Sequence, residues 1–359
     1  MKTSPSKSAA GSAAPARPAP WELSVYADEI YPPAAGLEPA LALFQRAGIK
    51  HTVLRVVNGR DSIVRLTNAE VDELGALLRK YGVRPQALDT PVFKGPLRKN
   101  HGFLGGYCPG FSDDMTFEDH LWYLGRAFEI ADRLGVPEVR CHSFWREYAF
   151  DEAFNEVVDR LGQAAAQARA AGRVLYLQNE QDTTAATGVE LARLLRTVNS
   201  PNLVAAYDLA NSARLDGVPF PDDYEALHGL LGSVQVKFQA IDVRSGWGSP
   251  SHDLSTPTIP YPPFYFWMQE DLPISGHVLI GERRFELDGP RTFLPLADSV
   301  DVDHRAFLQR LKRDGYQGTI SVDPGFHLPG TGLPADQRPE THWQKTIPDL
   351  QRLIAELKP

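Results

Sequence analysis

The feature that most constrains the fold of this chain is a repeated alternation between strand-like and helical sequence patterns. Eight short apolar segments have the length and composition of buried strands, and amphipathic helical patterns lie between them. The strand-like segments are 23–27, 52–57, 83–89, 136–143, 174–179, 203–208, 234–239 and 319–323. This alternation predicts an α/β fold, a (β/α)8 TIM barrel.

The helical segments support this prediction through their period and their ends. Apolar residues recur at helical spacing in 121–134, 154–168 and 343–357, and a glycine follows several helices just before the next strand. The alternative is an open doubly wound sheet. Such a sheet should carry a glycine-rich phosphate turn after an early strand, and no G-x-G-x-x-G occurs in the sequence.

Amino-acid composition indicates where the folded domain begins in the sequence. Residues 1–20 consist mainly of Ala, Pro and Ser with three basic residues, no acid and no apolar signal-peptide core. We expect a disordered tail there, with a transit peptide as the alternative, because such a segment buries too little to offset its ordering entropy. The barrel is expected to span 21–359, with an insertion at about 243–300 after the seventh strand.

Charge and composition exclude several classes of function. The net charge is −8, which argues against a nucleic-acid partner. No apolar run reaches the roughly 18 residues that cross a bilayer, so no membrane partner is expected. The two cysteines exclude a disulfide framework. We therefore expect a cytoplasmic protein.

Polar residues stand where a TIM barrel places its catalytic groups, at the carboxyl ends of the strands. Gln178 and Glu180 end the fifth strand, Asp208 the sixth and Asp323 the eighth. In the seventh strand, Gln235 and Lys237 share the face that points into the barrel. The pattern predicts one polar cluster at the barrel mouth; the alternative is a set of unrelated surface loop residues.

Several motifs resemble the sugar phosphate isomerase/epimerase superfamily, the xylose isomerase-like barrels. They are LRVVNGR (54–60), VRCHSFWR (139–146), LQNE (177–180), SPNL (200–203), YDLAN (207–211), PFPDDYE (219–225) and GYQG (315–318). The resemblance covers 21–357 in order and implies a barrel that acts on sugars.

The resemblance also implies four ligand positions for one divalent metal, namely Gln178, Asp208, Gln235 and Asp323. The family has Glu, Asp, His and Glu there, so three of the four positions differ. Amide oxygen is a weaker ligand than carboxylate, and it offers nothing to metals that prefer nitrogen. We expect no metal or a weakly bound Mg²⁺ or Mn²⁺, and no tight metal.

Without tight metal, other side chains must carry the chemistry. The candidates are Lys237, which desolvation would make a base or a carbonyl polariser, His142 and Glu180. Each also has a purely structural interpretation, such as a lysine paired with Asp208 or Asp323. The candidate substrate-binding residues are Arg55, Trp145, Arg146 and Trp247.

The insertion at 243–300 carries the aromatic run YPPFYFWM at 261–268. We expect either a lid over the pocket or a contact surface in a homo- or hetero-oligomer, and a self-packed excursion is the alternative. Aromatic rings also stack on the apolar faces of sugars, so the expected ligand is a small carbohydrate.

Two classes of function follow from these patterns. The first is an enzyme that isomerises, epimerises or eliminates next to a carbonyl of a sugar, cyclitol or keto-glycoside. The second is a non-catalytic carbohydrate-binding or partner subunit that has lost its metal site. The changes at Gln178 and Gln235 support the second, whereas Asp208 and Lys237 support the first.

Overall fold

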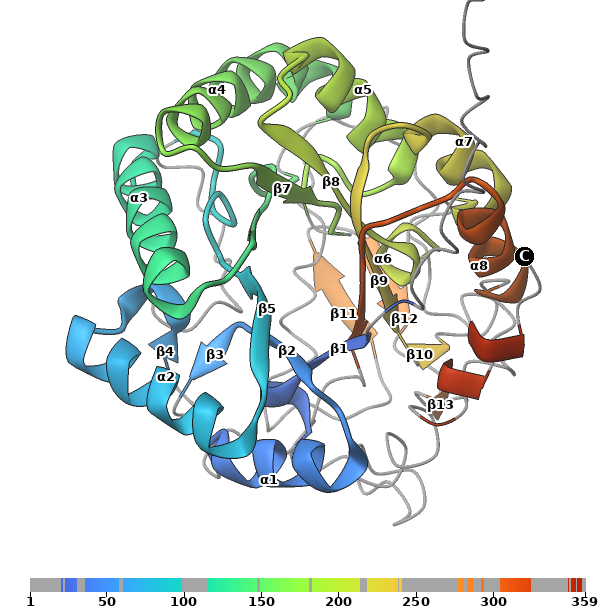
Figure 1. Cartoon of the computed structure of the whole chain (residues 1–359). Helices are drawn as coiled ribbons and strands as arrows, with labels where there is room; N and C mark the ends of the chain where they lie inside the picture. The colour runs from blue at the N-terminus through green and yellow to red at the C-terminus, as the bar shows by residue number, and fades with distance from the viewer. Residues whose placement is uncertain are drawn as a thin grey trace, which may run out of the picture.

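Eight parallel strands close into a barrel in the computed structural model of this chain, and helices surround them (Figure 1). The hydrogen-bonded order is β1-β14-β9-β8-β7-β6-β5-β2. The strands are β1 (Leu23–Tyr26), β2 (His51–Leu54), β5 (Arg84–Asp89), β6 (Glu138–Cys141), β7 (Leu175–Gln178), β8 (Leu203–Asp208), β9 (Leu231–Lys237) and β14 (Thr319–Asp323). The predicted fold class is confirmed, and each barrel strand overlaps one predicted segment.

The structure describes residues 21, 23–30, 36–57, 61–98, 115–146, 149–180, 183–213, 218–237, 239–240, 277–280, 283–286, 292–293, 304–323, 348, 350–352 and 354–356. The tail at 1–20 lies outside these ranges. So does most of the insertion, apart from backbone in β11 (His277–Ile280), β12 (Arg283–Glu286) and β13 (Thr292–Phe293), whereas β10 (Gln239–Ala240) precedes the insertion. The domain boundaries and the role of the insertion therefore stay predictions.

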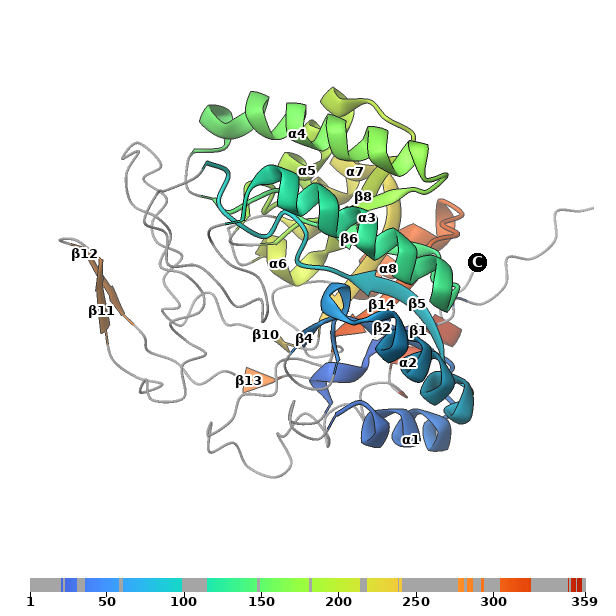
Figure 2. The ribbon, with the colours of Figure 1, turned by 90° about the vertical axis from the view of Figure 1, so that its left-hand side faces the viewer.

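Helices cover the outside of the barrel, as the side view shows (Figure 2). The α-helices are α1 (Glu38–Ala47), α2 (Asn68–Tyr81), α3 (Phe117–Leu134), α4 (Phe150–Ala170), α5 (Gly188–Val198), α6 (Leu209–Ala213), α7 (Tyr224–Leu227) and α8 (His304–Arg313), of which α6 directly follows the end of β8. Threonine capping boxes begin α2, α3 and α5. Gly48 and Gly82 end α1 and α2 in the left-handed conformation that glycine adopts without strain.

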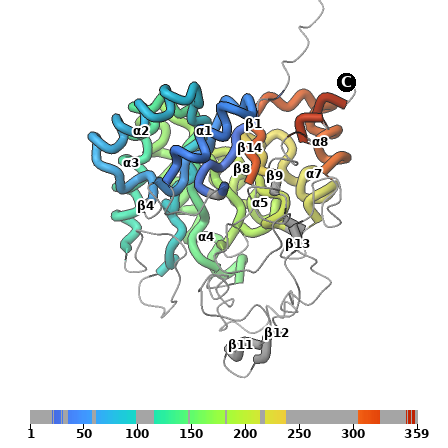
Figure 3. The backbone as a smooth tube through the Cα atoms, turned by 90° about the horizontal axis from the view of Figure 1, so that it is seen from below, coloured from blue at the N-terminus to red at the C-terminus, as the bar shows by residue number. Residues whose placement is uncertain are grey.

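The barrel closes between the first and the last strand. β1 pairs with β14 in parallel, and the two strands lie side by side in the view from below (Figure 3). The apolar core fills the layer between strands and helices, where Val25, Val234 and Phe307 are fully buried. Among the described helices, none is long and apolar enough to span a membrane.

The second predicted strand is shorter than expected. The barrel strand ends at Leu54, and Val56–Val57 form β3, which pairs with β4 (Asp61–Ser62) outside the barrel. The register between β2 and β5 shifts at Thr52/Val53, and the Arg55 carbonyl accepts a hydrogen bond from Ile63 N. The backbone at Arg55 therefore leaves the barrel ladder.

Candidate functional site

The interior of the barrel is charged rather than wholly apolar. β6 places Glu138 and Arg140 on its inner face, because residues two apart along a strand share a face. The Glu138 carboxylate accepts hydrogen bonds from Ser233 Oγ at 2.7 Å, Thr319 Oγ1 at 2.9 Å and Arg140 Nε at 2.5 Å. These contacts join β6 to β9 and β14 across the lumen.

Arg140 lies at the centre of this interior network and is buried. Its guanidinium also donates to Tyr26 Oη, Gln235 Oε1 and Ser321 Oγ, each at 2.8 Å. Burial alone would lower the pKa of Arg140, but the charge of Glu138 and the Glu138 hydrogen bond help to raise it above its ordinary value. Arg140 is therefore a permanent positive charge inside the barrel.

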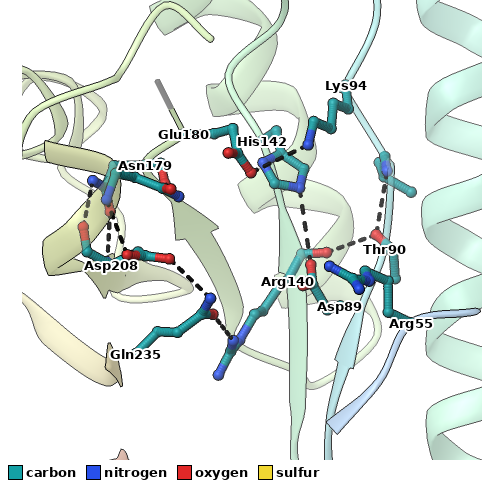
Figure 4. A network of polar contacts seen from close by, with 12 residues as sticks. Arg55, Asp89, Thr90, Lys94, Arg140, His142, Asn179, Glu180, Asp208 and Gln235 are labelled. Atoms are coloured by element: carbon teal, nitrogen blue, oxygen red, sulfur yellow. Dashed lines mark hydrogen bonds and ion pairs between the residues drawn. The ribbon is translucent and has the colours of Figure 1, made fainter. Parts of the chain in front are cut away.

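Gln235 connects Arg140 to Asp208, as Figure 4 shows, and it also contacts Asp323. Its Nε2 lies 2.8 Å from Asp208 Oδ2 and 3.3 Å from Asp323 Oδ2. The orientation of the amide is fixed by chemistry, because a guanidinium only donates hydrogen bonds and the atom facing Arg140 must be Oε1. The amide NH₂ group therefore faces both carboxylates.

Tyr26, the last residue of β1, also contacts Gln235 and Arg140. Its hydroxyl lies 2.6 Å from Asp89 Oδ2 and 2.7 Å from Gln235 Oε1, and its single proton serves one of them at a time. Burial raises the pKa of Tyr26 well above its ordinary value, although the nearby Arg140 charge opposes the shift. The phenol therefore stays protonated.

The end of β8 is held by two asparagines. Asn179 Oδ1 accepts from the backbone N–H of Asp208 at 2.7 Å, and Asn179 Nδ2 donates to the Asp208 carbonyl at 2.9 Å. The backbone N–H of Asn211 donates to Asp208 Oδ1 at 3.1 Å. Because Asp208 is held at both its backbone and its side chain, its carboxylate has a fixed position at the mouth.

The upper rim of the mouth carries an ion pair beside a histidine (Figure 4). Lys94, in the loop after β5, lies 3.1 Å from Glu180 Oε2, and their side chains are 10% and 13% exposed. His142 follows β6, with Nε2 3.9 Å from Asp89 Oδ1. The Lys94 ammonium, the His142 imidazole and the Glu180 carboxylate thus lie together beyond the carboxyl ends of the adjacent strands β5, β6 and β7.

Burial determines the charge of His142. Burial, helped by the nearby Lys94 charge, lowers the pKa of His142 to about 4, although Asp89 and Glu180 oppose the shift. The imidazole is neutral at neutral pH, so its contact with Asp89 is not an ion pair there. His142 can donate or accept a hydrogen bond without adding charge to the rim.

The loops that carry these groups are hydrogen-bonded to each other beyond the strands. His142 N donates to Val92 O, Phe144 N to Phe93 O and Trp145 N to Gly95 O. Phe93 and Phe144 have φ angles of 60° and 62°, a region that non-glycine residues seldom adopt. Strain of this kind persists where the surroundings enforce it and is common at functional sites.

Two buried polar atoms at the mouth have no hydrogen-bond partner among the described residues. They are Gln178 Oε1, on the last residue of β7, and His142 Nδ1. Buried polar atoms are nearly always hydrogen-bonded, so each such atom calls for a partner that the described chain does not provide.

Most predicted site residues lie at the mouth. Three of the four family ligand positions, Asp208, Gln235 and Asp323, are joined by hydrogen bonds, and Gln178 ends the strand that pairs with β8. Lys237 ends β9, but its side chain lies outside the described part of the chain, as does all of Trp247.

Three of the predicted substrate-binding residues, Arg55, Trp145 and Arg146, have other partners in this structure. Arg146 is bound by Glu190 of α5 at 2.7 Å and by the Thr184 carbonyl. Arg55 pairs with Asp28 at 2.9 Å and lies over the Tyr26 ring. Trp145 is 1% exposed, with Lys94 Nζ 5.8 Å from its ring centre. Their substrate roles stay predictions.

The sequence interpretation missed several of the residues that build the site. Asp89 ends a predicted strand just as Asp208 and Asp323 do, so the same rule would have found it. Glu138 and Arg140 alternate with apolar residues in the fourth predicted segment, which is the pattern that singled out Gln235. Lys94 lies in a loop and carries no comparable signal.

The donor set does not fit a divalent cation. The position between Asp208 and Asp323 is taken by the Gln235 amide nitrogen, which carries hydrogens and cannot ligate. Turning Oε1 toward the carboxylates would set the NH₂ group against Arg140, donor against donor. Among the described residues, no three His, Cys, Asp or Glu side chains form a metal-binding group.

A comparison with protein families now places the chain. Residues 41–347 match the family described as Xylose isomerase-like TIM barrel. This match covers most of the 359 residues, and the chain belongs to that family. A search of curated proteins found no match.

Solved structures share the fold at low identity. 3-Keto-D-glucoside 4-epimerase, YcjR, from E. coli has a TM-score of 0.54 and 13% identity, covering 94% of this chain and 98% of that chain. D-Allulose 3-epimerase from Methylomonas sp. has a TM-score of 0.59 and 15% identity, and the match covers 94% of this chain and 99% of that chain. The IOLI protein with a bound zinc atom has a TM-score of 0.58 and 15% identity, and the match covers 94% of this chain and 99% of that chain. These similarities establish the fold.

Proposed function

We propose that this barrel is an enzyme of the sugar isomerase and epimerase type. It would move a proton on a carbon next to a carbonyl in a sugar, cyclitol or keto-glycoside. The observation that carries the proposal is the rim itself, where the Lys94–Glu180 ion pair lies beside the neutral His142. Epimerases among the structural neighbours are consistent with this chemistry.

The two residues of the ion pair would supply the base and the positive charge that such a proton transfer needs. In the proposed reaction, the Glu180 carboxylate takes the proton from the carbon, and the Lys94 ammonium stabilises the negative charge that develops on the carbonyl oxygen. Glu180 then returns the proton to the neighbouring carbon, which gives an isomer. Epimerisation would instead need a second acid, for which Lys237 is the candidate, to protonate the same carbon from the opposite face. Elimination would instead expel a group from the next carbon.

Hydroxyl recognition follows from the remaining polar groups at the mouth. Gln178 Oε1 would accept a hydrogen bond from a sugar hydroxyl, and His142 Nδ1 would accept or donate one according to its tautomer. The rigid carboxylates of Asp208 and Asp323 would accept others. Lys237, at the end of β9, stays a predicted acid–base candidate at the same mouth.

The test is proton exchange at carbon. The purified chain is incubated in D₂O with a panel of ketoses, aldoses and keto-glycosides, and deuterium beside the carbonyl is measured by mass spectrometry. We expect incorporation with at least one substrate and an about 100-fold or greater loss in Glu180→Gln, as for removal of a general base. The matched control is Glu129→Gln, whose side chain is 68% exposed on α3.

A carbohydrate-binding protein without activity is the second candidate. The observation that favours it is the Gln235 amide, which holds Asp208 and Asp323 by hydrogen bonds. Saturable sugar binding without deuterium incorporation across the panel would support this candidate and contradict the enzyme. Incorporation that Glu180→Gln leaves unchanged would remove Glu180 from the proposed mechanism.

A further inference from the structure

The barrel interior gathers more carboxylates than an uncompensated protein interior tolerates. Glu138, Asp208 and Asp323 are each at most 1% exposed, and Asp89 is 5% exposed. Burying an ionised carboxylate is costly unless it is paired and hydrogen-bonded. A positive charge close to these groups is therefore a condition for keeping them ionised in the folded chain.

Arg140 is placed to meet that condition through direct and relayed contacts. It touches Glu138 directly, and it reaches Asp208 and Asp323 through the Gln235 amide. The amide dipole is aligned for this relay, with its oxygen on the guanidinium and its nitrogen on the carboxylates. Tyr26 makes a similar link from Arg140 to Asp89.

We propose that Arg140, acting through the Gln235 amide and the Tyr26 hydroxyl, takes the electrostatic place of the divalent cation that the family resemblance assigns to this mouth. The guanidinium compensates the carboxylates from inside the barrel, and the amide nitrogen fills the position between Asp208 and Asp323. The positive charge belongs to a residue of β6, so it is present without the binding of a metal ion. This inference is independent of the proposed sugar chemistry, since metal binding and stability test it.

The same geometry explains why metal would be repelled from the wild-type mouth. A dication between Asp208 and Asp323 would lie one amide group away from a permanent guanidinium charge, and the repulsion scales with the product of the charges. Removing the guanidinium therefore has two effects. It removes a positive charge that Glu138 contacts directly and that Asp208 and Asp323 share through Gln235, and it frees Gln235 to turn its oxygen toward them.

The experiment compares the wild type with Arg140→Met after treatment with a chelator. Each is titrated with Mn²⁺ and with Mg²⁺ in a calorimeter, and thermal unfolding is followed with and without millimolar Mn²⁺. We expect no saturable binding to the wild type. For Arg140→Met we expect an Mn²⁺ association constant at least about 100-fold above the upper limit that the wild-type titration sets, and an upward shift of its unfolding midpoint by Mn²⁺. Arg173→Met, at an ion pair outside the barrel with Asp132, is the matched control and should respond like the wild type.

Arg140→Gln is the second variant, because it keeps hydrogen-bond donors but carries no charge. It should bind Mn²⁺ better than the wild type, and a variant that refolds only with Mn²⁺ also supports the proposal. Stoichiometric, tight Mn²⁺ or Mg²⁺ binding by the wild type overturns it. So does a failure of both Arg140 variants to gain Mn²⁺ affinity or to refold with Mn²⁺.

Discussion

His120 and His142 are buried imidazoles that make the folded chain sensitive to acid. Burial is the main cause that lowers the pKa of each to about 4. The unfolded chain takes up these protons near pH 6.5, whereas the folded chain does so only near pH 4. The unfolded state therefore binds more protons between these values, and stability decreases as the pH falls through this window.

We predict that the free energy of unfolding falls by up to about 3 kcal/mol for each of these histidines between pH 6.5 and 4. Urea titrations across that range measure it. His142→Asn, which cannot take up the proton, should flatten the pH dependence. If the unfolding free energy of His142→Asn changed with pH as steeply as that of the wild type, His142 would not be a source of the acid sensitivity.

At the residue scale, strand alternation revealed which side chains meet but not how they bond. The sequence predicted that Asp208, Gln235 and Asp323 converge, and hydrogen bonds join them. It did not predict that Gln235 would present its nitrogen to the carboxylates. That orientation is imposed by Arg140 from β6, a contact 95 positions away in the sequence.

The elements that position the rim are the loops after β5 and β6. Gly95 lies where these loops pair, and a Cβ on it would lie 2.8 Å from Nε2 of the buried His120 ring. Lys94 is the preceding residue, so a displaced Gly95 moves the ammonium relative to Glu180. The close approach of loop and ring requires glycine at this position.

We predict that Gly95→Ala lowers the proposed exchange activity by about tenfold or more, because small misplacements of a catalytic group are costly. Gly162→Ala is the control, since Gly162 lies within α4 with nothing near its added Cβ. Alanine there should keep activity and add about 0.5–1 kcal/mol of stability. Wild-type activity in Gly95→Ala would show that the loop does not position Lys94.

The existence and order of the barrel elements were predictable, because their apolar periods are local and regular. The break at Arg55 was not, since it follows from pairing between β3 and β4 and from the Ile63 hydrogen bond to the Arg55 carbonyl. The loop carrying Lys94 was also beyond prediction. Its position depends on backbone contacts with the segment after β6.

At the scale of the whole molecule, the barrel brings together a charged interior and a polar rim. Arg140 and Glu138 join β6 to β1, β9 and β14, and the rim groups stand above them at the carboxyl ends of neighbouring strands. The lower network fixes Gln235, Asp208 and Asp323, and the upper loops fix Lys94, His142 and Glu180. The proposed proton transfer therefore depends on the chain's own side chains.

Deuterium incorporation into a keto-sugar in the presence of excess chelator tests that claim most directly. The account predicts that the exchange rate of the wild type is the same with and without the chelator. Exchange that stops with the chelator and returns with Mn²⁺ or Mg²⁺ would contradict it.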